Sequence, residues 1–113
     1  MSIKVVYNAT FGGFSISQAC AVRMAELGNK EAAEMLADEV ECWYGYLCET
    51  PRHDPTLVQA VEELGDAAGG AMAALDVHEL SGLRYIIREY DGSETVVEPS
   101  DIIWNVVDVS NEL

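Results

Sequence analysis

The sequence has few basic residues, few cysteines and no long apolar run, and each shortage excludes a class of protein. Only 6 Lys and Arg residues accompany 20 Asp and Glu residues, which gives a formal net charge of −14. Nucleic acids and anionic membranes carry charge of the same sign, so we expect the chain to bind neither directly. No apolar stretch approaches the roughly 18 residues that a membrane-spanning helix needs.

Three cysteines, Cys20, Cys42 and Cys48, are too few and odd in number for a disulfide framework. The first ten residues, MSIKVVYNAT, lack the charged-then-apolar layout of a secretory signal. We therefore expect reduced thiols and a cytoplasmic protein. Half of the residues are apolar, which is enough for one folded domain over residues 1–113.

Capping residues, apolar periodicity and turn residues predict an α+β domain. Helices are predicted from Ser15 to Gly28, from Asn29 to about Cys42, and from Asp54 to Gly65. Strands are predicted at Ile3–Tyr7, Ala71–Leu80, Leu83–Tyr90, Ser93–Glu98 and Ile102–Val109. Asp91-Gly92 is a strong hairpin signal, and Ser15 with Gln18 matches a capping box. We expect an N-terminal strand, with two to three helices on one face of a largely antiparallel sheet of four to five strands.

The second predicted helix carries a row of carboxylates. They occupy positions i, i+3, i+7 and i+10 and are Glu31, Glu34, Asp38 and Glu41. On a helix they would form one line with neighbours about 5–6 Å apart. Two interpretations are open: a decoy that imitates the phosphates of a nucleic acid, and an ordinary solvated face.

Large aromatic residues follow this helix in the segment that contains Trp43, Tyr44 and Tyr46. Aromatic side chains concentrate at the centres of protein interfaces, so these three are candidate anchors for a partner. Filling the small core of the protein is the alternative role.

The glycine pair Gly12-Gly13 precedes the first predicted helix. Such a turn can present backbone N–H groups to an anion, and Ser15 and Arg52 would complete a nucleotide site. The alternative is a tight strand-to-helix turn whose phenylalanines, Phe11 and Phe14, fill the core.

No arrangement of residues in the sequence predicts catalysis or metal binding. Cys42, Cys48 and His53 match no zinc-ligand spacing, and neither histidine has a defensible nucleophile partner. Glu89 and Glu94 would face each other across the hairpin, either as a paired carboxylate site or exposed to solvent. We expect no enzyme activity, no metal and no cofactor.

Three segments, YNATFGGFSIS, RHDPTLVQAVEELGDAAGG and YIIREYDGSETVVEP, resemble a group of small proteins of phages and large DNA viruses. Members of that group show Y-G-G-F-x-[LI]-S, then R-x-D-P-x-L-V-x-x-V-E-x-L-G, then E-Y-D-G-x-E, in the same order. The residues here that match are Phe11, Gly12, Gly13, Phe14, Ser15, Arg52, Asp54 and Pro55. Thr10-Phe11 replaces a common Cys-Tyr pair, and residues 29–51 look like an insertion of this branch. The resemblance implies a viral origin and the α+β order, but no activity.

Small size, acidity and this resemblance suggest an inhibitor of host defence in a bacterial cytoplasm. The leading hypothesis is an anti-CRISPR protein whose acidic helix face occupies a basic nucleic-acid groove of a host protein or ribonucleoprotein complex. Trp43, Tyr44 and Tyr46 would supply the desolvated contacts. Alternatives are a sponge for nucleotide second messengers, and a structural or scaffold viral protein; a homodimer is also compatible with the sequence.

Overall fold

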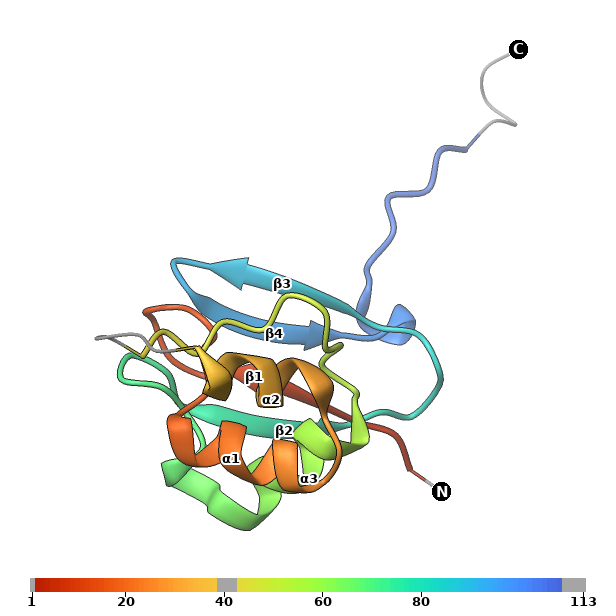
Figure 1. Cartoon of the computed structure of the whole chain (residues 1–113). Coiled ribbons are helices and arrows are strands. Elements are labelled where there is room, and N and C mark those ends of the chain that lie inside the picture. Colours follow the sequence, from red (N-terminus) through yellow and green to blue (C-terminus); the bar gives the residue numbers. More distant parts are fainter. Residues whose placement is uncertain (1, 39–42, 109–113) are drawn as a thin grey trace.

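The computed structural model describes residues 2–38 and 43–108, and it confirms the α+β prediction (Figure 1). The elements are, in chain order, β1 (Lys4–Asn8), α1 (Gln18–Glu26), α2 (Lys30–Ala37), α3 (Pro55–Leu64), the 3₁₀ turn η1 (Gly65–Ala67), β2 (Leu75–Glu79), β3 (Ile86–Tyr90), β4 (Ser93–Val97) and the 3₁₀ turn η2 (Pro99–Asp101). None of the helices in these ranges has the length and apolar character needed to cross a membrane.

The strands form two antiparallel pairs rather than the single sheet that we expected. β1 pairs with β2, from Lys4 opposite Glu79 to Asn8 opposite Leu75, and β3 pairs with β4. β1 and β4 meet through a side chain instead of a strand ladder: the Asn8 backbone N–H donates to the Glu94 carboxylate over 2.8 Å. The arrangement places β1 between the helices and the β3–β4 hairpin.

The hairpin itself follows the prediction. Tyr90 pairs with Ser93, and the two residues between them, Asp91 and Gly92, have φ angles of 50° and 88°. Two successive positive φ angles define the type I′ turn that suits the twist of a two-residue hairpin, and Asp-Gly tolerates them.

Two of the three predicted helix starts are confirmed by their caps. The Asn29 side chain accepts a hydrogen bond from the Ala32 N–H, and the Asp54 carboxylate accepts one from the Thr56 N–H. The first helix, however, begins later than predicted, and Ser17 is its N-cap.

The capping box at Ser15 is therefore wrong, and the reason is a tertiary contact. Ser15 and Ile16 stay extended because their backbone bonds to other segments: Gly70 N–H donates to the Ser15 carbonyl, and Ile16 N–H donates to the Gly45 carbonyl. This extended stretch also forms an isolated bridge between Ile16 and Gly69. The local pattern could not reveal such partners.

Other predicted elements are shorter than expected, and one is absent. The second helix ends at Ala37, because Asp38 adopts an extended conformation; Cys42 lies outside the described residues. The strand predicted from Ala71 is formed only at Leu75–Glu79, and the strand predicted from Leu83 only at Ile86–Tyr90. Residues 102–108, predicted as a strand, have no regular secondary structure and extend away from the domain (Figure 1); Val109 lies outside the described range.

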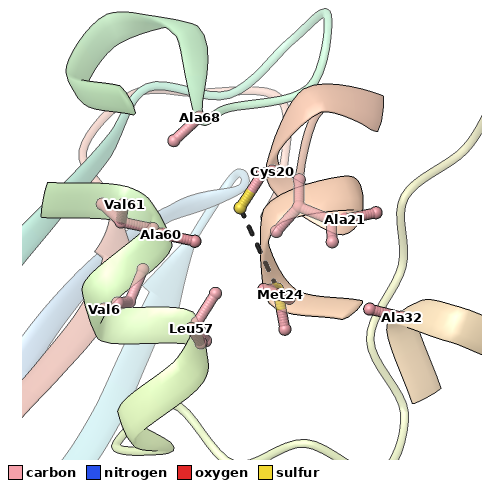
Figure 2. Packing of buried hydrophobic residues seen from close by; sticks show 10 residues of the cluster. Val6, Cys20, Ala21, Met24, Ala32, Leu57, Ala60, Val61 and Ala68 are labelled. Carbon is pink, nitrogen blue, oxygen red and sulfur yellow. Dashed lines mark hydrogen bonds between the residues drawn. The ribbon is translucent and has the colours of Figure 1, made fainter. Parts of the chain in front are cut away.

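The two faces of β1 bury different cores. Val6 faces the helices, where it packs with Cys20 and Met24 of α1 and Leu57 of α3 (Figure 2). Val5 faces the hairpin and packs with Leu80 and Val96. Both valines are completely buried, as expected for successive residues of a strand covered on both sides.

We predict that the two cysteines in the described ranges differ strongly in reactivity. Burial raises the pKa of the Cys20 thiol to about 11, whereas Cys48 is exposed. Because the thiolate is the reactive form, maleimide should label Cys48 at least about a hundredfold faster than Cys20. Mass spectrometry of tryptic peptides after timed labelling measures both rates in one sample. Equal rates in the folded protein would contradict the packing of α1.

Candidate interaction surface

The predicted row of carboxylates is not one line on a helix. Glu31 turns toward the chain that follows α2, and its carboxylate accepts hydrogen bonds from the N–H groups of residues 48–50 over 2.6–2.9 Å. Burial by itself raises the pKa of Glu31, but the hydrogen bonds from Thr50, Cys48 and Glu49 outweigh burial and lower the pKa. Glu31 is therefore a structural residue that fixes this segment.

Glu34 lies on α2 with Glu31, but Asp38 does not continue their helical line. Glu34 is exposed on α2, and Asp38 is exposed at its end, where the backbone has left the helix. Glu41 lies outside the described residues. The single-line geometry is wrong, while a role of Glu34, Asp38 and Glu41 in binding stays a prediction.

The three aromatic residues after α2 divide between core and surface. Trp43 packs against the main core, and its indole N–H donates to the Ile16 carbonyl over 2.9 Å. Tyr44 and Tyr46 remain 65% and 62% exposed. Their rings stack with centroids 6.2 Å apart and planes 17° apart, so they form one aromatic surface, the tyrosine pair.

The residue between the two tyrosines attaches the pair to the core. Gly45 is buried with a φ of 67°, and its carbonyl accepts the Ile16 N–H over 2.9 Å. A Cβ atom at Gly45 would collide with the Ile16 carbonyl, so only glycine allows this approach. Together with the bonds of Trp43 and Glu31, this contact holds the tyrosine pair in place on both sides.

Gly12, Gly13, Ser15 and Arg52, which the sequence suggested as an anion site, do not line one common hollow. A hollow of about 420 Å³ at Gly12 and Gly13 is lined by the acidic residues Glu89 and Asp91, and not by Ser15 or Arg52. Ser15 is buried. The negative charge around the two glycines disfavours a phosphate there.

Arg52 makes a two-pronged ion pair with Glu94 instead of facing solvent. Its two terminal nitrogens lie 2.6 and 2.9 Å from the two carboxylate oxygens of Glu94, which is itself buried. The guanidinium also stacks on Phe14, 3.5 Å from the ring centroid. This paired fork is the strongest form of carboxylate recognition by arginine.

Asn8 completes this polar cluster under the hairpin. Its side chain donates to the carbonyls of Thr10 and Gly92 and accepts the Ala74 N–H. The prediction that Glu94 faces Glu89 is confirmed in register, but only Glu89 is exposed and it accepts the Gly92 N–H. No local sequence pattern predicts that Arg52 pairs with Glu94, because the two residues are 42 positions apart.

A second polar cluster joins β2 to the end of β4. The buried Glu98 carboxylate contacts the His78 ring nitrogen at 3.0 Å and accepts hydrogen bonds from the Ser81 hydroxyl and N–H. The bond to His78, followed by those from Ser81, lowers the pKa of Glu98 to about 2. Ser81 and His78 bind the same carboxylate, so the three residues form a structural link rather than a nucleophile with its base.

Metal ligands are not assembled in the described parts of the chain. No group of three or more His, Cys, Asp or Glu side chains in these ranges is arranged to hold a metal ion. His53 is exposed and contacts the Tyr85 hydroxyl at 2.6 Å, while Cys48 is on the surface and Cys42 lies outside the described ranges.

Comparisons of the chain with protein-family models, with curated proteins and with solved structures give no match. The viral resemblance therefore stays a prediction.

We predict that protonation of Glu98 at acidic pH lowers the stability of the folded protein. Its pKa is about 2 in the folded protein against an ordinary value of 4.5, so its contribution is complete above about pH 4.5 and is lost as the pH falls toward 2. Glu98→Gln should lower the melting temperature near neutral pH, and the difference from the parent should shrink between pH 4.5 and 2. Glu79→Gln, an exposed change on β2, is the control and should show no such trend. A constant difference across this range would contradict the assignment.

Proposed function

We propose that the protein is a phage-encoded inhibitor of a host defence complex, and that it acts by binding rather than by catalysis. Its partner in this proposal is a host protein or ribonucleoprotein with a basic nucleic-acid-binding surface, such as a CRISPR effector, in the bacterial cytoplasm. The observation that carries the proposal is the exposed, stacked and firmly attached tyrosine pair on a strongly acidic chain.

The tyrosine pair has the properties of an interface anchor. Tyrosine supplies a large contact area and loses little conformational freedom, and it is among the residues that dominate binding energies. Because Gly45, Trp43 and Glu31 already hold the segment, few further degrees of freedom are lost on binding.

The charge of the chain selects a basic partner. Lys4, Arg23 and Arg52 each pair with a glutamate of the same chain, so half of the 6 basic residues already have an acidic partner. Exposed carboxylates on α2 and on the tyrosine-bearing segment include Glu34, Asp38 and Glu49. Such a field speeds association with a basic groove and weakens as salt is added. The decoy in this form relies on local negative charge, without the regular helical row.

The test has two parts. Phage plaques are counted on a defence-proficient bacterium that expresses the full chain, and more plaques are expected than without it. The complex that the chain captures at low salt is then isolated by affinity purification. Tyr44→Ser with Tyr46→Ser should weaken binding to that complex at least tenfold, which corresponds to about 1.4 kcal/mol. The matched control, Tyr44→Phe with Tyr46→Phe, keeps the rings and should retain most of the affinity.

A second pair of variants separates local charge from net charge. Glu34→Gln with Asp38→Asn should slow association and reduce its salt dependence. Asp66→Asn with Glu79→Gln removes the same charge from η1 and β2 and should have a smaller effect. Unchanged inhibition by the serine variants, or equal effects of the two charge variants, would contradict the proposed surface.

A further inference from the structure

The segment of residues 102–108, the C-terminal arm, exposes an unusual amount of apolar surface. It leaves the domain after η2 and extends away from it (Figure 1). Ile103 and Val106 are 94% and 87% exposed, and Trp104 and Val107 are also exposed. β-Branched and aromatic residues in an extended chain are typical of a strand, and a strand needs a partner for its backbone N–H and C=O groups.

The outer edge of β3 has the matching requirement. β3 pairs with β4 on one side, and no strand in the described residues pairs with its other side. Tyr85 and Ile87 pack toward Val5, so the alternating residues Arg84, Ile86, Arg88 and Tyr90 face outward. Beside them lies a largely apolar groove of about 710 Å³, lined by Leu83, Ile86, Val97 and Pro99 and, where the arm leaves the domain, by Ile102 and Trp104 of the arm itself.

We propose that the C-terminal arm of one chain adds as an antiparallel strand to the β3 edge of a second copy, which returns its own arm. One antiparallel register places complementary side chains of the arm opposite all four outward-facing residues. Residues whose numbers sum to 192 stand opposite one another, which pairs Ile102 with Tyr90, Trp104 with Arg88, Val106 with Ile86, and Asp108 with Arg84. Apolar side chains then cover apolar ones, an indole meets a guanidinium and opposite charges meet.

Charge and length both favour the arm of a second copy as the strand that pairs with the outer edge of β3. Two acidic copies repel each other as wholes, but Arg84 and Arg88 have no ion-pair partner in the part of the chain that the structure describes. The outward-facing side chains are thus locally positive at Arg84 and Arg88, whereas Glu89 points to the opposite face of the hairpin, and the register places Asp108 opposite Arg84. The seven residues of the arm span about 23 Å when extended, enough to cover the five residues of β3, which span about 17 Å.

The arm cannot take this register on its own chain. Ile102 and Ile86 line the same groove, and Val97, shortly before the arm, pairs with Ile86. Ile102 therefore lies at the Ile86 end of β3, whereas the antiparallel register requires it at Tyr90, the opposite end. The partner strand must come from another molecule.

The test is sedimentation velocity of the full chain under reducing conditions, from about 1 to 500 µM, because an exchanged pair assembles by mass action. The mass should rise from 12.3 kDa toward twice that value. In this register Asn105 stands opposite Ile87, whose N–H and C=O groups point away from β4 and toward the arm. Asn105→Pro removes a backbone donor from this pair and should weaken dimerisation at least tenfold while leaving the melting temperature of the monomer unchanged. Asn105→Ser, the matched control, keeps the donor and should dimerise like the parent. A parent that stays monomeric, or a proline variant that dimerises equally, overturns the proposal.

A charge exchange tests the register. Asp108→Arg should weaken dimerisation at least tenfold by placing like charges opposite Arg84, and Arg84→Asp in the same chain should restore it to within about threefold. If the second change does not restore dimerisation, the proposed register is wrong.

Discussion

The ion pair between Arg52 and Glu94 is the contact on which the arrangement of the domain depends. β1 and the β3–β4 hairpin share no strand ladder, so the hairpin is held to β1 by packing on Val5 and by the polar cluster around Glu94. Glu94 is buried, and a buried carboxylate without a partner would cost several kcal/mol. Arg52 supplies both hydrogen bonds of a fork, and the Asn8 N–H supplies a third.

The same pair connects the two surfaces to which we assign binding roles. The Arg52 carbonyl accepts the Val6 N–H, which fixes the end of the segment that carries the tyrosine pair. On its other side, Glu94 fixes β4 and therefore the position of β3 with its unpaired outer edge. One buried contact thus positions the tyrosine pair relative to the hairpin, although neither Arg52 nor Glu94 belongs to either surface.

Sequence reasoning succeeded where short-range rules decide the structure and failed where distant partners do. The caps at Asn29 and Asp54 and the Asp91-Gly92 turn depend on residues within three positions of each other. Ser15 looked like a cap, but its carbonyl is bonded to Gly70, far along the chain. Glu31 looked like a surface charge from its spacing, yet three N–H groups of residues 48–50 bind it. For the arm, an apolar run predicted a strand, but residues 102–108 have no regular secondary structure, because no other strand in the described residues pairs with them.

Arg52 and Glu94 stabilise the fold as a pair, and a double-mutant cycle measures the coupling between them directly. The free energy of unfolding is determined by urea titration for the parent, Arg52→Met, Glu94→Gln and the double variant. Each single change should cost about 3 kcal/mol, because it leaves a buried group without its partner, and the double change should cost at least about 2 kcal/mol less than the sum. Costs that add to within about 0.5 kcal/mol would contradict the account.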